Sequence, residues 1–266
     1  MKILVTGKNG QLGFELQRAL APLGAIVAVD REECDLSNAT AIRALVQATK
    51  PDLIVNPAAY TAVDRAESEP QLATALNALA PAVLGEEATR IGAGVIHYST
   101  DYVFDGTSPR PYVETDATNP LNVYGRTKRD GDLALQQSCR QHLVFRTSWV
   151  VGAHGSNFAK TMLRLAKERD SLSIVADQMG APTSAALLAD VTAQLIGRMQ
   201  REGREHFPFG LYNLTNGGVT SWHAYACFVL QQALDAGITL KTHPAQVKAI
   251  TTAEYPLPGI RPASSQ

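Results

Sequence analysis

The chain has 266 residues, of which 45% are hydrophobic and 18% are charged, and its 24 basic and 25 acidic side chains give a formal net charge of −1. This composition is typical of a globular protein with a large core, arranged as one large domain or two intertwined domains. The balanced charge provides no general attraction to nucleic acids or anionic membranes, so the sequence predicts neither as a partner.

The cysteines and the N-terminal residues bear on the cellular compartment in which the protein is expected. Cys34, Cys139 and Cys227 are widely separated and include no C-x-x-C pair, which is typical of buried thiols in a reducing compartment. The apolar run at residues 3–5 is too short for a signal peptide or a membrane span. We therefore expect a cytoplasmic protein.

The first thirty residues predict a βαβ unit. A β-branched run at residues 2–6 predicts a buried strand, a glycine-rich turn follows, and a helix is expected to begin at Phe14. The turn contains Gly7, Gly10 and Gly13, which permit a tight bend and let backbone N–H groups approach a pyrophosphate at the start of the helix. This pattern predicts a dinucleotide-binding site.

The second strand of this unit ends at Asp30, and that residue bears on the choice of cofactor. Its carboxylate is placed to accept hydrogen bonds from the adenosine ribose hydroxyls, which favours NADH. Arg31 and Lys8 would instead attract the 2′-phosphate of NADPH. The sequence therefore leaves NADH and NADPH both open.

Strands and helices continue to alternate along the chain. Further strands are expected at residues 52–56, 94–99, 142–147, 172–175 and 210–214. Helices are expected at residues 39–49, 71–91 with a kink or break at Pro81, around Tyr124, and at 158–169, 185–199 and 221–236. The alternation predicts an α/β fold with a Rossmann-type doubly wound parallel sheet. We expect residues 1–148, completed by some later segments, to form the dinucleotide-binding domain and residues 149–266 to form mainly a smaller, interleaved substrate-binding lobe.

The roles of two polar residues depend on how the chain folds around them. Ser37 precedes the helix expected at residues 39–49 and is a candidate for its cap. Asn77 is the polar exception in an alanine-rich helix, where a solvated position and a structural hydrogen-bonding role near the site are equally compatible with the pattern.

The strongest chemical signal is a phenol and an ammonium one helical turn apart, at Tyr124 and Lys128. A phenol has a reference pKa of about 10, and a neighbouring ammonium stabilises the phenolate, so the pair can serve as a general acid/base. The strand at residues 94–99 delivers Thr100 and Asp101 at its carboxyl end, where a hydroxyl can orient a carbonyl or the phenol. Small residues at 57–61, after the preceding strand, would let a flat cofactor lie against the backbone.

The motifs G-x-x-G-x-x-G and Y-x-x-x-K, with Thr100 on the strand before the latter, resemble those of the extended short-chain dehydrogenase/reductase superfamily. Within it, the chain is similar to the dTDP-4-dehydrorhamnose reductase family in the stretches G-K-N-G-Q-L-G, S-T-D-Y-V-F-D-G, N-V-Y-G-R-T-K, D-Q-M-G-A-P-T and R-P-A-S-S. These stretches span nearly the whole chain. The resemblance implies reduction of the C4 ketone of a nucleotide sugar, dTDP-4-dehydro-L-rhamnose, with NADH or NADPH as hydride donor.

The resemblance also implies roles for individual residues. Tyr124 would donate a proton to the C4 oxygen, Lys128 would hold the nicotinamide ribose, and Thr100 would hydrogen-bond the phenol or the sugar. Substrate contacts are expected from Asp101, Trp149 and Arg261. Besides the glycines and the acid/base pair, cofactor contacts are expected from Gln11, Leu12, Asp30, Asp35, Leu36, Ala59, Tyr60 and Thr61.

The resemblance also leads to expectations about metal binding, oligomeric assembly and the length of the chain. Some relatives use Mg²⁺ at a subunit contact, and a homodimer is compatible with this, but the sequence has no carboxylate cluster with ligand spacing and predicts no metal-binding residue. Relatives usually continue for a few tens of residues past the R-P motif, and Ser264 stands where they commonly have Asn. We therefore expect part of the substrate lobe to be missing, which bears on Arg261.

Two alternatives remain beside the reductase. Another nucleotide-sugar reductase or epimerase shares the superfamily motifs, although D-Q-M-G-A-P-T argues against it. A non-catalytic regulatory subunit of a methionine adenosyltransferase would share the fold but would not require Tyr124, Lys128 and Thr100.

Overall fold

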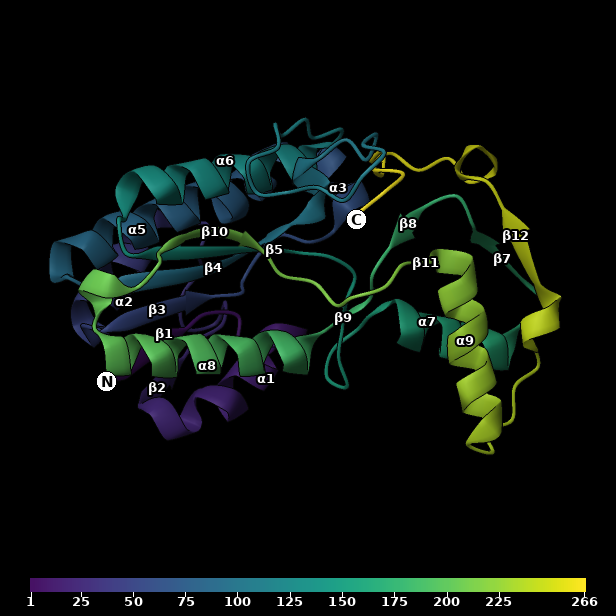
Figure 1. The fold of residues 1–266 in the computed structure, drawn as a ribbon, viewed down its shortest axis with the longest axis horizontal. Helices are drawn as coiled ribbons and strands as arrows, with labels where there is room; N and C mark the ends of the chain where they lie inside the picture. The colour runs from purple at the N-terminus through teal and green to yellow at the C-terminus, as the bar shows by residue number, and fades with distance from the viewer.

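A parallel six-stranded sheet forms the centre of the computed structural model, which describes residues 1–266 (Figure 1). Its neighbouring strands are all parallel and lie in the order β10 (Gly210–Asn213), β5 (His142–Thr147), β4 (Gly94–Thr100), β3 (Leu53–Asn56), β1 (Lys2–Val5) and β2 (Ala25–Ala28). From β1 the chain moves to β2 on one side and then returns to β3 on the other, so the predicted doubly wound sheet is confirmed. This reversal leaves a crevice at the carboxyl ends of β1 and β3, where open α/β sheets bind their ligands.

Side-chain alternation along the strands divides the core into two layers. Ile3 and Val5 point to one face of the sheet and Leu4 to the other, because successive strand residues face opposite sides. The first face is covered by α1 (Gln11–Leu20) and α8 (Ala185–Glu202), and the second by α2 (Ala39–Thr49), α5 (Ala80–Ile91) and α6 (Val123–Ser138). Both faces are therefore buried, as a parallel sheet requires.

A separate apolar cluster forms the core of the end of the molecule that lies farthest from the N-terminus (Figure 1). It is formed by α7 (Phe158–Glu168), α9 (Trp222–Asp235), β7 (Leu172–Val175) and β12 (Val247–Ile250), and the last two pair in parallel. The remaining α-helices and strands are α3 (Val63–Ser68), α4 (Pro70–Thr74), β6 (Val150–Val151), β8 (Met179–Gly180), β9 (Thr183–Ser184) and β11 (Thr220–Ser221). Pairing of β6 with β9 and of β8 with β11 ties the segments after β5 together.

The first helix begins earlier than the sequence indicated. We expected a start at Phe14, but α1 begins at Gln11, with Gly10 as its N-cap. Gly13 therefore lies inside the helix rather than in the turn. The apolar residues Leu12 and Leu16 are both buried against the sheet, which favours the earlier start.

The helix expected at residues 71–91 is broken, as Pro81 predicted. A π-helical segment, Ala75–Leu79, separates α4 from α5, and the N–H of Ala80 donates to the carbonyl of Ala75, five residues back. Because Pro81 lacks an N–H, it cannot continue a regular α-helical ladder through this point. Asn77 lies in this segment and is fully buried, so its solvated reading is wrong.

The cap of α2 is Asn38, and the prediction of Ser37 is wrong by one residue. The Asn38 side chain accepts hydrogen bonds from the N–H groups of Thr40 and Ala41, at 3.0 and 3.2 Å. The hydroxyl of Ser37 instead donates to Asp35 at 2.8 Å. Ser37 is therefore occupied by the preceding loop.

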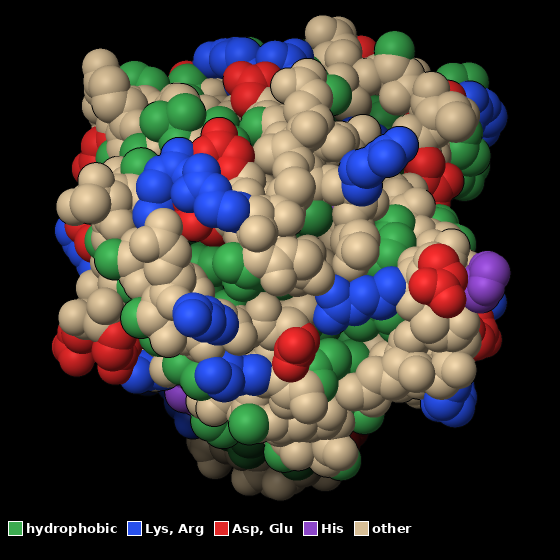
Figure 2. All heavy atoms as spheres, turned by 90° about the vertical axis from the view of Figure 1, so that its left-hand side faces the viewer, with side chains coloured by type: hydrophobic (Ala, Val, Ile, Leu, Met, Phe, Trp, Pro, Cys, Tyr) green, Lys and Arg blue, Asp and Glu red, His purple; other side chains and the backbone are tan.

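The surface carries no large region of one charge on the side shown in Figure 2, where basic and acidic side chains lie among one another. The three cysteines are all free, so no disulfide crosslinks the fold. None of the helices combines the length and the apolar character that crossing a membrane requires.

Asn38→Ala is expected to destabilise the protein by about 1 kcal/mol, because two N–H groups at the start of α2 lose their acceptor. Ser37→Ala is the matched control and should cost less, since its hydroxyl caps no helix. The free energy of unfolding from urea titrations of the two variants and the wild type measures both effects. A larger loss in Ser37→Ala would contradict the assignment of the cap.

Candidate active site

A crevice of about 470 Å³ lies at the carboxyl ends of β1, β3 and β4, where the sheet topology places the ligand. It brings together ten of the residues selected from the sequence, namely Gly7, Gly10, Gln11, Leu12, Gly13, Asp30, Ala59, Thr61, Tyr124 and Lys128. The sequence did not single out other lining residues, including Asn9, Thr147, Val150, Gly155 and Ser156. Several of these follow β5 and reach the crevice only through tertiary folding.

The glycine turn is closed by backbone contacts that exclude a side chain. Gly7 has φ +58°, and a Cβ atom at Gly13 would lie 2.0 Å from the Gly7 carbonyl oxygen. The N–H of Gly10 donates to the same oxygen at 3.0 Å. No side chain caps α1, so its first N–H groups remain available to an anionic ligand at the positive end of the helix.

Asp30 lines the crevice but also holds the turn in place. Its carboxylate accepts hydrogen bonds from the main-chain N–H groups of Asn9 and Arg31, at 3.0 and 2.8 Å. The ammonium of Lys8 forms an ion pair with Glu33 rather than standing free. These contacts leave the choice between the two nicotinamide cofactors open.

Three of the residues expected to contact the cofactor have side chains directed elsewhere. Asp35 accepts hydrogen bonds from the hydroxyl and the N–H of Ser37, and Leu36 is buried in the core beneath α2. The phenol of Tyr60 donates to Glu69 at 2.5 Å. The side chains of Asp35, Leu36 and Tyr60 therefore do not line the crevice, because each is engaged in its own loop or core.

Asn77 supports this loop from below. Its side-chain oxygen accepts from the N–H of Tyr60 at 2.8 Å, and its amide donates to the carbonyl of Tyr60 and to the hydroxyl of Thr127, at 3.0 and 3.1 Å. The buried amide thus joins the loop after β3 to α6, which carries the acid/base pair. The structural reading of Asn77 is the one that the fold supports.

Tyr124 and Lys128 lie one turn apart on α6 and both line the crevice. Burial raises the pKa of Tyr124 to about 12, and the neighbouring hydroxyl of Thr100 acts in the opposite direction. The ring of Tyr124 packs edge-on against Tyr102, with the ring centroids 5.5 Å apart. The phenol is therefore neutral at physiological pH.

Lys128 is almost completely buried, with 1% of its surface exposed. Its Nζ donates to the carbonyl of Tyr98 at 2.7 Å and lies 3.1 Å from Nε2 of His97. Burial lowers the pKa of Lys128 to about 8. The expectation that Lys128 lowers the pKa of Tyr124 is wrong for this structure, because β4 holds the ammonium and burial dominates the phenol.

A buried ion pair next to Lys128 was missed from the sequence. Asp132 lies one turn further along α6, and its Oδ2 is 3.2 Å from Nε of Arg146 on β5. The Asp132 carboxylate raises the pKa of Lys128 and so opposes the effect of burial. The repeated four-residue spacing from Tyr124 to Asp132 was the available signal, together with the polar residues His97 and Arg146 in otherwise apolar strands.

Thr100 and Asp101 follow β4 directly and are held by each other. The Thr100 hydroxyl donates to Oδ1 of Asp101 at 3.0 Å, and Oδ2 of Asp101 accepts from the hydroxyl of Ser265. Burial raises the pKa of Asp101 to about 6. The same hydroxyl acts to lower the pKa of Tyr124, so it lies near both acidic groups.

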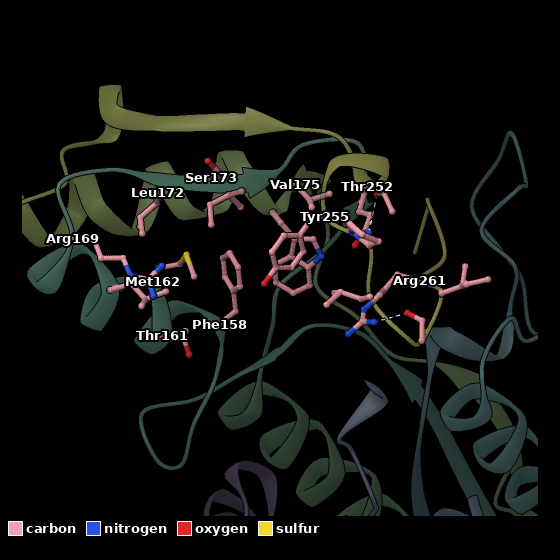
Figure 3. A pocket seen from close by; sticks show the side chains of 18 of the residues that line it. Phe158, Thr161, Met162, Arg169, Leu172, Ser173, Val175, Thr252, Tyr255 and Arg261 are labelled. Atoms are coloured by element: carbon pink, nitrogen blue, oxygen red, sulfur yellow. Dashed lines mark hydrogen bonds between the residues drawn. The ribbon is translucent and has the colours of Figure 1, made fainter. Parts of the chain in front are cut away.

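Arg261 lines a second, larger cavity of about 810 Å³ between α7, β7 and the C-terminal segment (Figure 3), and Trp149 contacts another of its lining residues, Trp222. Trp149, with φ +46°, stacks face to face on Trp222, and the ring centroids are 3.5 Å apart. Trp222 and Arg261 line the cavity, and Arg261 also forms an ion pair with Asp64. Tyr102 lines it too and packs on Tyr124, so the cavity adjoins the acid/base pair.

The structure offers no group of three or more His, Cys, Asp or Glu side chains placed to hold a metal ion. The expectation of Mg²⁺ therefore receives no support from the side-chain arrangement. The chemistry of the crevice depends on the glycine turn and on the acid/base pair of α6. A doubly wound sheet that presents these two features to one crevice defines an oxidoreductase of the extended short-chain dehydrogenase/reductase class.

Comparison with known proteins gives the particular family. The family model described as RmlD substrate binding domain matches residues 1–266, and the chain belongs to this family. The dTDP-4-dehydrorhamnose reductase of Salmonella typhimurium is 53% identical over 270 residues, covering 100% of this chain and 89% of that protein.

Solved structures agree with this assignment. A dTDP-4-dehydrorhamnose reductase from Clostridium acetobutylicum gives a TM-score of 0.89 at 36% identity, covering 100% of this chain and 89% of the other. The enzyme of the same name from Bacillus anthracis, solved in complex with NADP, gives a TM-score of 0.88 at 34% identity, covering 99% and 89%.

Gly13→Ala is expected to destabilise the protein by about 1–3 kcal/mol and to weaken dinucleotide binding, because the new Cβ would overlap the Gly7 carbonyl. Gly217→Ala is the matched control, since a Cβ there meets no atom within 4 Å. Thermal unfolding with and without NADPH measures both effects. The geometry of the turn would be contradicted if Gly13→Ala retained the stability and the cofactor-induced shift of the control.

Proposed function

We propose that the protein reduces the C4 ketone of dTDP-4-dehydro-L-rhamnose to give dTDP-L-rhamnose, using NADH or NADPH. The observation that carries the proposal is the presence of Tyr124 and Lys128 in one crevice with the uncapped start of α1. The 53% identical relative from Salmonella typhimurium bears the name of this reductase, and a relative from Bacillus anthracis was solved with NADP, which supports the substrate and the cofactor.

The crevice suits a nicotinamide dinucleotide. The free N–H groups at the start of α1 would bind the pyrophosphate, and the carboxylate of Asp30 would accept hydrogen bonds from the adenosine ribose. The small residues Ala58 and Ala59 line the crevice after β3 and leave room for a flat ring. When bound, the nicotinamide supplies the hydride that reaches C4 of the sugar.

Tyr124 would supply the proton. Reduction of a ketone develops negative charge on its oxygen, and a positioned acid that donates as this charge develops contributes about 10²–10⁴-fold to the rate. The raised pKa of Tyr124 keeps its proton in place until the oxygen becomes basic. Thr100, which donates to Asp101 and lies near the phenol, would orient the phenol and receive the sugar.

Lys128 would bind the nicotinamide ribose. Its ammonium lines the crevice one turn of α6 from Tyr124. The second cavity would take the nucleotide part of the substrate, with Asp101 and Trp149 beside the sugar. Arg261 would reach the nucleotide while it keeps its ion pair with Asp64.

The direct test mixes the protein with dTDP-4-dehydro-L-rhamnose and, separately, with NADH or NADPH. The loss of reduced-cofactor absorbance should match the formation of dTDP-L-rhamnose mole for mole. Omission of the sugar is the control for cofactor oxidation by other routes. Absence of any consumption with both cofactors would overturn the proposal.

Tyr124→Phe is expected to lower kcat by about 10²-fold or more, because the ketone oxygen loses its proton donor while the ring that packs on Tyr102 remains. Cofactor binding should survive. Tyr212→Phe is the control, since its hydroxyl donates to Pro208 on the far edge of the sheet. Steady-state turnover and cofactor titration separate the two effects, and wild-type turnover by Tyr124→Phe would exclude Tyr124 as the acid.

Turnover is also expected to fall as the pH rises past about 8, where the buried ammonium of Lys128 loses its proton. The direction follows from the loss of the cation that would hold the ribose, because Tyr124, with a pKa of about 12, remains protonated there. The profile of kcat over the neutral and alkaline range measures this, with cofactor decay recorded separately at each pH. If kcat stayed constant at pH values far above 8, the proposed role of Lys128 would be contradicted.

A further inference from the structure

A row of buried polar side chains crosses the sheet behind Lys128. The hydroxyl of Thr6 donates to Oδ1 of Asn56 at 2.6 Å, and the Asn56 amide lies 3.0 Å from Nδ1 of His97. Nε2 of His97 lies 3.1 Å from Nζ of Lys128. All four residues are at most 1% exposed, so this row of side chains, from the end of β1 through β3 and β4 to α6, is shielded from solvent.

The surroundings of His97 fix its charge and its tautomer. Burial and the neighbouring Lys128 ammonium lower the pKa of His97 well below its usual range, so the imidazole is neutral. An ammonium only donates, so Nε2 is the acceptor and the single ring proton lies on Nδ1. The main-chain oxygen of Asn56, 3.2 Å from Nδ1, accepts that proton, so Nδ1 has no lone pair left for the Asn56 side chain and its 3.0 Å contact with Nδ2 is not a hydrogen bond.

This arrangement determines what Lys128 presents to the crevice. An ammonium has three N–H donors. The carbonyl of Tyr98 and Nε2 of His97 take two of them, which leaves one for a group in the crevice. Because a lysine side chain is flexible, two fixed contacts from β4 are what hold its end in one place.

We propose that His97 is a positioning residue that accepts a hydrogen bond from Lys128 and thereby holds its ammonium charged and directed into the crevice. The hold on Lys128 follows from the geometry of the ligand-free protein. Its consequence for turnover rests on the proposed function, in which Lys128 meets the cofactor ribose.

Other groups near Lys128 also influence its charge and must stay unchanged in a test. Burial lowers its pKa, and the carboxylate of Asp132 raises it. The titratable and charged groups around the acid/base pair are Tyr124 and Asp132 on α6, His97 and Tyr98 on β4, Asp101 and Tyr102 after β4, and Arg146 on β5. Substitution of His97 alone leaves the others in place.

Two amide variants separate the contact with Lys128 from the contact with Asn56. In His97→Gln the side-chain amide reaches the position of Nε2 and can still accept from Lys128. In His97→Asn it reaches only the position of Nδ1, so it can bond Asn56 but not Lys128. Thr6→Val is the structural control, because it removes a hydrogen bond at the far end of the same buried row.

The readout is the titration of the Lys128 Nζ by ¹⁵N NMR in ligand-free protein labelled at lysine, with the signal assigned by its loss in Lys128→Met. We expect the midpoint to fall by about one pH unit in His97→Asn, because a hydrogen bond to a charged group is lost. His97→Gln and Thr6→Val should titrate like the wild type. In turnover, kcat should fall by about 10- to 100-fold in His97→Asn and much less in the other two.

Thermal unfolding shows which variants are folded, and His97→Leu replaces His97→Asn if the latter does not fold. The proposal is overturned if the midpoint stays in place without the acceptor, if His97→Gln shifts as far as His97→Asn, or if, with an active wild type, kcat of the two amide variants is equal. The titration needs neither cofactor nor substrate. It therefore decides the contact even if the wild type shows no turnover, an outcome that would overturn the proposed function alone.

Discussion

The buried ammonium of Lys128 is the constraint on which the site depends. A charge so far from water is tolerated only when its donors are paired, and β4 supplies both acceptors through His97 and Tyr98. To reach them α6 must lie close to its neighbours, and it does so through two glycines. A Cβ at Gly125 would lie 2.2 Å from the carbonyl of Tyr102, and one at Gly131 would lie 1.9 Å from that of Asn77.

The same close packing connects the two cavities. Tyr102 follows β4, lines the larger cavity and packs edge-on against Tyr124, which lines the crevice. A substrate that fills the larger cavity with its nucleotide and extends its sugar past Tyr102 would place that sugar against the phenol. At this junction the hydroxyl of Thr100 donates to the carboxylate of Asp101 and lies near the phenol. The geometry thus favours a long substrate with one reactive end.

Local sequence patterns were sufficient to predict much of the fold and the centre of the site. The glycine turn between a strand and a helix, and the alternation that follows, are short-range features, so the sheet topology and the position of the crevice could be predicted. The one-turn spacing of Tyr124 and Lys128 likewise depends only on helix geometry. Even the break before Pro81 follows from a missing N–H.

The remainder depends on contacts between distant parts of the chain. The pairing of Lys128 with His97 and of Asp132 with Arg146 requires the packing of α6 on β4 and β5, which no local pattern specifies. Adjacent candidates were also hard to separate, since Asn38 directly precedes α2 and caps it, whereas Ser37 one residue earlier bonds Asp35. Some residues expected to contact the cofactor, such as Tyr60, instead form hydrogen bonds with residues near them in the chain.

The most direct test of the account is a crystal structure of the protein with a bound nicotinamide cofactor. The account predicts the pyrophosphate at the start of α1, a ribose hydroxyl within hydrogen-bonding distance of Nζ of Lys128, and the reactive carbon of the nicotinamide facing the phenol of Tyr124. A dinucleotide bound in the larger cavity beside Arg261, or one whose nicotinamide lies away from Tyr124 and Lys128, would contradict it.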